Sequence, residues 1–327
     1  ADFEPLSAEE LTVFDADHPQ PADALGDADL QQQMIERSRR QFAELLAAPG
    51  ENLQEYRRVI GTAARVMLGE VPTADSITSE VVDESQAGGA QLLKGWSRRA
   101  NGKVTPWLAL VPPGADGRAV LWVHGEGKSR LLNDAGAPSE SVQPLLDDGL
   151  SVVSIDQFGS GEFPANSLQA RHKVLTETYP GFLFCYNRPL LAEQVGDILT
   201  AAVSLTEHPE ITEVHLVGTG GAGAVTLLAR ALLPADALGR TIVDLEEVSF
   251  AKVSERTDPL LLPAALKYGG LGGLAALALP GSLTIYGIDA EREAEFAPLR
   301  ELAGDSGSVT ISTTPLDVSR LVQEIED

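Results

Sequence analysis

A short apolar run, a dense glycine turn and a helical run follow one another between 213 and 233. The glycine turn spans 218–223 and reads GTGGAG. A turn too tight for side chains, between a strand and a helix, is how G-x-S-x-G enzymes present the serine that attacks an ester. Aligning Gly218 with the first glycine of that pattern places Gly220 at the serine position and Gly221 directly after it. The sequence therefore predicts the turn that carries a nucleophile, without the hydroxyl group.

Two other side chains are candidate nucleophiles. Ser160 lies between two glycines, and His172 follows about a dozen residues later as its candidate base. A serine in that setting is more often an ordinary turn residue. Cys185 is the only thiol, and Arg188 with the helix expected from Pro189 supplies the cation and the helix N-terminus that a cysteine nucleophile needs. A cysteine among aromatic residues more often packs as a small apolar side chain.

Carboxylates at the ends of expected strands admit a different chemistry. Oxygen ligands of this kind suit calcium or magnesium. The alternative is that they cap helices or pair with cations such as Lys128 and Arg188. We favour capping and pairing, and predict neither a metal nor a cofactor. The carboxylates are those of Glu126, Asp156, Glu162 and Asp289.

The glycine turn also fits the dinucleotide fingerprint G-x-G-x-x-G, with Gly218, Gly220 and Gly223 as its glycines. A pyrophosphate would then lie at the N-terminus of the following helix. The acid that binds the ribose would have to be Asp244 or Glu246. Against this, the turn follows a late strand, whereas the first strand-to-helix turn lacks the fingerprint. Dinucleotide binding stays an alternative.

The elements that position these residues alternate between strand-like and helix-like runs from Arg118 onward. This alternation predicts a mostly parallel sheet with helices on both faces, whose strands carry the chemistry at their carboxyl ends. A long loop is expected between Glu162 and Pro189, and a Pro-, Gly- and Leu-rich excursion at 251–280. The expected strands are 119–123, 150–155, 214–217, 241–245, 282–286 and 309–312, and the expected helices are 139–148, 189–206, 291–302 and 316–325.

The N-terminal part has a different pattern. Apolar residues at helical spacing predict amphipathic helices over 27–48 and 52–68, which must pack on another surface. Antiparallel strands are expected next, at 77–82, 91–100 and 104–111. We therefore divide the chain into a helical extension at 1–75 and an α/β domain at 76–327, in which 251–280 forms a cap-like excursion.

Composition excludes several classes of partner. The chain has 48 acidic and 24 basic residues, and its net charge is −24. Nucleic acids and anionic membranes require a basic face on their protein partners. We predict neither as a partner. No stretch reaches the roughly 18 apolar residues of a membrane span, and a single cysteine excludes an internal disulfide. The chain begins at Ala1, as removal of a leader, an upstream domain or a tag would leave it.

This order of parts resembles the α/β-hydrolase superfamily, and within it the acetyl xylan esterases and dienelactone-hydrolase-like carbohydrate esterases. The likeness covers roughly 77–327. Besides the glycine turn it rests on the apolar strand before His124, the D-x-x-G-x-G turn from Asp156 and the G-I-D turn from Gly287. The resemblance implies an α/β-hydrolase fold: a mostly parallel central sheet with antiparallel N-terminal strands, helices on both faces and an N-terminal helical extension.

The resemblance also assigns roles to single residues. His124, Gly125 and Glu126 fall at the usual place of the oxyanion loop, and Asp289 falls where such enzymes often carry the acid that orients a histidine. A carboxylate repels a developing oxyanion, so Glu126 argues against acyl transfer.

The resemblance does not extend to the whole Ser-His-Asp triad. The family requires a serine at the position of Gly220 and a histidine after the last strand. No histidine follows His215, and the loop at 312–315 occupies its expected place. Losing a triad residue typically costs several orders of magnitude in rate.

We therefore interpret the chain as a carbohydrate-esterase-like protein with a degenerate triad, acting as a non-catalytic binding or scaffold domain. Its expected partner is an acylated carbohydrate or another protein domain. An active hydrolase of acylated carbohydrates, with Ser160 or Cys185 attacking and His124 or His172 as base, stays an alternative. The residues expected at the pocket are Gly125, Glu126, Cys185, Arg188, Gly220 and Gly221.

Overall fold

The computed structural model describes residues 4–46, 52–163, 166–179, 181–246, 248–304 and 307–326. The chain forms two compact units, 1–44 and 45–327. Helix α1 (Asp27–Leu46) falls almost entirely in the first unit and buries none of its residues. The last two residues of the helix expected at 27–48 lie outside the described residues.

Helix α2 (Asn52–Leu68) belongs to the second unit, so the expected extension at 1–75 is not one body. Its apolar stripe is buried through Tyr56, Ile60, Ala64 and Leu68, which recur at helical spacing. This helix packs against α6, α7 and α8 of the same unit. The expectation that its amphipathic face needs a partner surface is confirmed.

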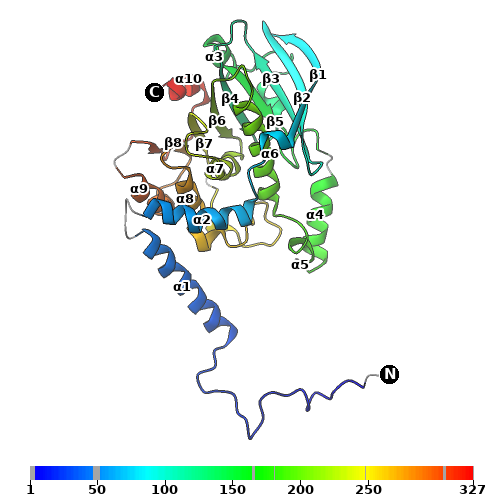
Figure 1. Ribbon diagram of the computed structural model, residues 1–327, viewed down its shortest axis with the longest axis vertical. Coiled ribbons are helices and arrows are strands. Elements are labelled where there is room, and N and C mark those ends of the chain that lie inside the picture. Colours follow the sequence, from blue (N-terminus) through cyan, green and yellow to red (C-terminus); the bar gives the residue numbers. More distant parts are fainter. Residues whose placement is uncertain are drawn as a thin grey trace. The chain divides into compact units, whose positions relative to one another are not determined.

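The described residues of the second unit contain a nine-stranded sheet with the order β1-β2-β3-β5-β4-β6-β7-β8-β9. Pairing is antiparallel from β1 to β5 and parallel from β5 to β9, as predicted. Figure 1 shows the long strands β1 to β3 (cyan) beside α6. The strands are β1 (Ile77–Ala87), β2 (Ala90–Arg99), β3 (Val104–Val111), β4 (Arg118–His124), β5 (Ser151–Ile155), β6 (Glu213–Thr219), β7 (Arg240–Asp244), β8 (Ser282–Tyr286) and β9 (Val309–Ile311).

Helices follow the strands, with four departures from expectation. The helices expected at 291–302 and 316–325 begin later, at Ala297 and Leu321, each after a short 3₁₀ helix. The helix expected at 139–148 is shorter, because Pro144 suits only a first helical turn. The loop expected after Glu162 contains helices, which the sequence signalled weakly because Leu168 and Leu175 stand two turns apart with few apolar neighbours. The helices are α3 (Gln143–Asp147), α4 (Asn166–Glu177), α5 (Gly181–Phe184), α6 (Leu190–Thr206), α7 (Gly223–Leu232), α8 (Gly270–Ala275), α9 (Ala297–Ala303) and α10 (Leu321–Glu326).

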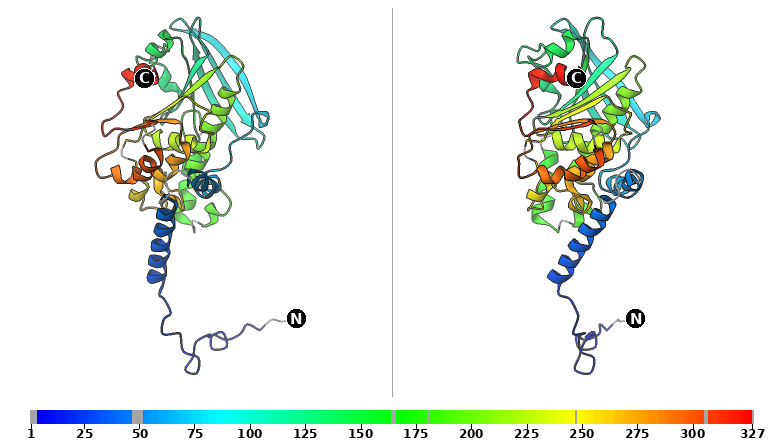
Figure 2. Two further views of the ribbon diagram at one scale, coloured as in Figure 1. Left: turned by 60° about the vertical axis from the view of Figure 1, so that its left-hand side comes forward. Right: turned by 90° about the vertical axis from the view of Figure 1, so that its left-hand side faces the viewer.

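Both faces of the sheet are covered, as the alternating pattern predicted. On one face Leu145 of α3 and Leu321 and Ile325 of α10 pack with Val120 and Trp122 of β4. On the other face α6 and α7 contact the central strands. In the views of Figure 2, α10 (red) lies beside α3 and away from α2 (blue). None of the helices in the described ranges is long and apolar enough to cross a membrane.

Candidate functional site

The glycine turn joins the end of β6 to the start of α7, so the predicted strand-to-helix turn is confirmed. Gly220 and Gly221 have φ angles of +60° and +84°, which glycine adopts without the strain that a Cβ atom would cause. Gly223 is required for space, because a Cβ there would overlap the carbonyl oxygen of Asp244 on the neighbouring strand. The glycine pattern thus has a backbone cause at each of these positions.

The imidazole of His124 lies directly over Gly220. A Cβ at position 220 would be within 2.8 Å of Nε2, Cε1 and Cδ2 of that ring. Real Cβ atoms do not approach other atoms so closely, so any side chain at 220 would have to displace the ring. The space where a side chain at position 220 would begin is therefore filled by His124.

A hydrogen bond to His124 determines which ring nitrogen of the neutral imidazole carries the proton. Its Nδ1 accepts the backbone N–H of Glu126 at 3.1 Å, which assigns the neutral ring's proton to Nε2. Burial lowers the pKa of His124, and the nearby Arg130 guanidinium lowers it further, against the opposing carboxylates of Glu126 and Glu246. A neutral ring with its proton on Nε2 donates a hydrogen bond and does not accept a proton at that atom.

The amides of the expected oxyanion loop are used within the protein. The N–H of Gly125 donates to the carbonyl of Thr219 at 3.3 Å, and the N–H of Glu126 donates to His124. Gly125 packs so close that a Cβ on it would overlap the carbonyl oxygen of Gly220. An oxyanion hole needs amides that are free to donate to the substrate, and these two are occupied.

A cavity of about 270 Å³ opens beside the glycine turn, and we call it the Gly220 cavity. Its volume is slightly below the roughly 300 Å³ at which pockets for drug-sized ligands begin, so it suits one small polar ring. Its apolar wall consists of Trp122, Leu131, Leu316 and Val318. Its polar wall consists of His124, Arg130, Ser141, Thr219, Asp244 and Glu246.

Asp244 ties the cavity to the C-terminal segment. Its carboxylate accepts the backbone N–H of Glu246 at 3.0 Å and that of Leu316 at 2.8 Å. Because both oxygens bind main-chain amides, the carboxylate is committed to holding the loop, and it is not free for the ribose that a dinucleotide would present. Glu246 has a φ of +46°, an uncommon conformation for a non-glycine residue and one found at binding sites.

Sequence reasoning missed several of these wall residues. The sequence predicts Asp244 and Glu246 only as ribose ligands, although the end of the strand next to the glycine turn is where a site residue is expected. Arg130 lies in a short 3₁₀ helix and Ser141 and Leu316 lie in loops, and only the folded chain brings them together.

Asp289 and Ser160 do not line the Gly220 cavity. One oxygen of Asp289 accepts the backbone N–H of Arg292 at 2.9 Å, and the other lies 3.9 Å from Nζ of Lys252. The Ser160 hydroxyl donates to the carbonyl of Gln157 at 2.8 Å, as an ordinary turn serine does.

Cys185 and Arg188 are exposed and lie outside the cavity wall as well. The expectation that Cys185 packs as a small apolar side chain is wrong, because the chain turns outward directly after α5. His172 is exposed on α4.

The carboxylates considered as metal ligands have cationic neighbours instead. Lys128 is buried and forms ion pairs with Asp156 and, at 2.6 Å, with Glu162. Glu126 pairs with Arg130 at 3.2 Å. The described part of the chain contains no group of three or more His, Cys, Asp or Glu side chains placed to hold a metal ion.

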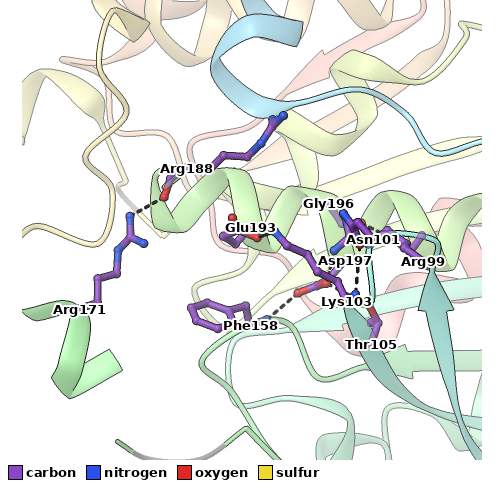
Figure 3. A network of polar contacts seen from close by, with 11 residues as sticks. Arg99, Asn101, Lys103, Thr105, Phe158, Arg171, Arg188, Glu193, Gly196 and Asp197 are labelled. Carbon is purple, nitrogen blue, oxygen red and sulfur yellow. Dashed lines mark hydrogen bonds and ion pairs between the residues drawn. The ribbon is translucent and has the colours of Figure 1, made fainter. Parts of the chain in front are cut away.

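A buried carboxylate on α6 anchors the turn that follows β5. Asp197 accepts hydrogen bonds from Arg99 at 3.0 Å, from the Thr105 hydroxyl at 3.0 Å and from the backbone N–H of Phe158 at 2.8 Å. Figure 3 shows these contacts together with the neighbouring pair of Lys103 and Glu193. Burial raises the pKa of Asp197, while the hydrogen bonds and Arg99 oppose that shift.

The strand order, the helices on both faces and the strand-to-helix glycine turn define an α/β-hydrolase fold. Solved structures with this fold that the chain resembles include carbohydrate esterases. One is a candidate acetyl xylan esterase from Bacteroides fragilis, with a TM-score of 0.66 and 14% identity over 88% of this chain and 82% of that chain.

Two further relatives in structure are CE15 enzymes. An esterase from a marine bacterial metagenome gives a TM-score of 0.54 and 14% identity over 86% of this chain and 92% of that chain. A glucuronoyl esterase from Teredinibacter turnerae gives a TM-score of 0.52 and 10% identity, over 85% of this chain and 84% of that chain. Identities this low describe a common fold. No protein-family model matches the chain, and no curated protein matches it in sequence.

Proposed function

We propose that this chain is a carbohydrate-esterase-like protein that binds an acylated carbohydrate in the Gly220 cavity without hydrolysing it. The position of His124 over Gly220 carries the proposal. A hydrolase of this fold needs a hydroxyl at that position and an imidazole that accepts its proton. Here the imidazole fills the place of the missing side chain and holds its own proton on Nε2.

The occupied amides support the same conclusion. Free amides that stabilise an oxyanion are worth about 2.7–4 kcal/mol each in transition-state stabilisation. The amides of Gly125 and Glu126 donate within the protein instead. A substrate carbonyl would therefore have to break existing hydrogen bonds before these donors could stabilise its negative charge.

The wall of the Gly220 cavity supports a neutral, hydroxyl-rich ligand. Nε2–H of His124 and the guanidinium of Arg130 can donate, Glu246 can accept, and the hydroxyl of Ser141 can do both. Trp122 and Leu316 supply apolar surface of the kind an acetyl methyl group packs against. One solved structure that shares this fold supports the same ligand class, since its name describes a candidate acetyl xylan esterase.

An active hydrolase with a rearranged nucleophile is the second candidate. It would use Ser160 or Cys185, yet the Ser160 hydroxyl is bonded to the carbonyl of Gln157 and Cys185 lies on the surface. Neither lines the cavity that contains His124. The geometry therefore supports binding over hydrolysis.

Isothermal titration with an acetylated xylo-oligosaccharide tests the proposal, with the deacetylated sugar as the matched control. We expect the acetylated form to bind at least tenfold more tightly, and mass spectrometry to recover it with every acetyl group in place. His124→Ala should weaken binding, because it removes a donor from the wall. Equal affinity for the two sugars, or release of acetate at enzymatic rates, would refute the proposal.

A further inference from the structure

A second cavity lies between α4, α5 and the segment 256–261, and we call it the α4 crevice. Its volume is about 150 Å³, and it shares no residue with the Gly220 cavity. Much of its wall is hydrocarbon, contributed by Leu168, Leu175, Phe184, Leu190 and Leu261. A cavity of about 150 Å³ holds one benzene ring, so the crevice has room for a small aromatic or short aliphatic group.

Cations without carboxylate partners border this apolar surface. These cations are Arg171 of α4 and Arg256 of the segment 256–261, and the imidazole of His172 lines the crevice beside them. Arg171 donates to the backbone carbonyl of Arg188 at 2.7 Å, and Arg256 donates to that of Thr176 at 3.2 Å. Neither guanidinium forms an ion pair with a carboxylate of the described residues, although acidic residues outnumber basic ones two to one in the chain, 48 to 24.

One carboxylate, that of Asp258, also lines the crevice. One of its oxygens accepts the backbone N–H of Leu260 at 2.8 Å, so it is engaged in its own turn. The wall of the crevice therefore carries two guanidinium groups and one carboxylate. Arg171 is half-buried, and removing a charge from water without a counter-charge is unfavourable. An anion beside Arg171 and Arg256 would offset that cost.

We propose that the α4 crevice binds a small monocarboxylate with an apolar body. The carboxylate lies between the guanidinium groups of Arg171 and Arg256, and the hydrocarbon part packs against Leu175 and Leu261. Arginine binds carboxylates through paired N–H donors. Each guanidinium has donors left over, because the contacts to backbone carbonyls use one nitrogen of each. The site is independent of the function proposed for the Gly220 cavity.

Fluorine NMR on the full chain with 4-fluorobenzoate tests the proposal directly. We expect one saturable site with a Kd in the millimolar range or below, and at least tenfold weaker binding of the neutral analogue 4-fluorobenzamide. Arg256→Gln and Arg171→Gln should each raise the Kd of 4-fluorobenzoate at least tenfold. Arg58→Gln, which removes an exposed arginine of α2 paired with Glu55, should leave it unchanged.

The controls keep the test decisive. Arg256 is exposed, so its variant should fold even if Arg171→Gln does not, and Arg171→Lys should keep part of the affinity because it keeps the charge. Absence of binding at roughly 10 mM, which is weaker than any useful affinity, would overturn the proposal. So would equal binding of 4-fluorobenzamide, full displacement by equimolar inorganic phosphate, or unchanged affinity in Arg256→Gln.

Discussion

The imidazole of His124 lies over the backbone of Gly220, the position that the G-x-S-x-G pattern assigns to a nucleophile. Three ring atoms lie within 2.8 Å of the point where a Cβ at 220 would stand. The ring is held there by the hydrogen bond that Nδ1 accepts from the N–H of Glu126. The absence of a side chain at 220 and the position of His124 are therefore two aspects of one packing arrangement.

Substitution of Gly220 should show this coupling. We expect Gly220→Ala to lower the free energy of unfolding by about 1–2 kcal/mol, because alanine is strained in a left-handed backbone. Displacing the imidazole ring should lower it by about 1–3 kcal/mol more. Gly221→Ala is the matched control, since its φ is also positive and a Cβ there would meet nothing within 4 Å. Urea unfolding of both variants measures the difference.

The same comparison in a His124→Ala background isolates the contact. In that background the difference in unfolding free energy between the alanine variants at 220 and 221 should fall below about 0.5 kcal/mol. Without the ring, position 220 no longer contacts residue 124, and the effects of non-contacting sites add. A difference that stays unchanged without the ring would mean that His124 does not determine the residue at 220.

The ionisation of His124 gives a second prediction. Titration by NMR should give an apparent pKa below 6.5, and imidazole ¹⁵N shifts at neutral pH should identify the Nε2–H tautomer. Arg130→Gln should raise that pKa, because it removes a nearby positive charge. A pKa above 6.5, or the Nδ1–H tautomer, would contradict the assigned role.

The sign of the resulting pH dependence follows from linkage. The folded state holds the pKa of His124 below its unfolded value, so between those two values the unfolded chain binds more protons. The free energy of unfolding should therefore decrease as pH falls through 6.5 towards the folded pKa, and level off below it. His124→Gln should flatten this slope in part, since burial also lowers the pKa of His215.

Of two neighbouring ion pairs, Arg99–Asp197 and Lys103–Glu193, the first should lose more stability when its carboxylate is removed. Asp197→Asn leaves Arg99 without its counter-charge in a buried setting, and we expect a loss of about 3–5 kcal/mol. Glu193→Gln breaks the more exposed pair with Lys103 and should cost less than about 1 kcal/mol. If urea unfolding gave equal losses of stability for the two variants, burial would not explain the difference we expect between the two ion pairs.

Asp244 should control the order of the segment that closes the Gly220 cavity. Asp244→Ala removes the acceptor of the Leu316 amide, so hydrogen exchange at Leu316 should accelerate and affinity for the acetylated sugar should fall. Exchange at the buried β4 amide of Leu121 should change far less. Unchanged exchange at Leu316 would contradict this role.

The central architecture was predictable because its signals are local and strong. Buried strands read as apolar runs. The glycines of the turn have backbone reasons, such as the positive φ of Gly220 and the overlap at Gly223. Helix α4 was missed because its apolar residues are sparse. Proline shortened the helix that contains Pro144.

The site itself was predictable only in part. Sequence order places His124, Gly125 and Gly220 at neighbouring strand ends, and the structure brings them together. The wall residue Leu316 is set by a hydrogen bond to Asp244, 72 positions away, which no local pattern encodes. The direction of the His124 side chain likewise depends on a hydrogen bond formed only in the fold.

Ester turnover by the purified chain tests the central claim most directly. With p-nitrophenyl acetate as substrate, we expect the unmodified chain to release p-nitrophenol no faster than its His124→Ala variant or a Ser160→Ala/Cys185→Ala double variant. Turnover of about 1 s⁻¹ or more, within the range of working enzymes, that disappears in any of these variants would contradict the account.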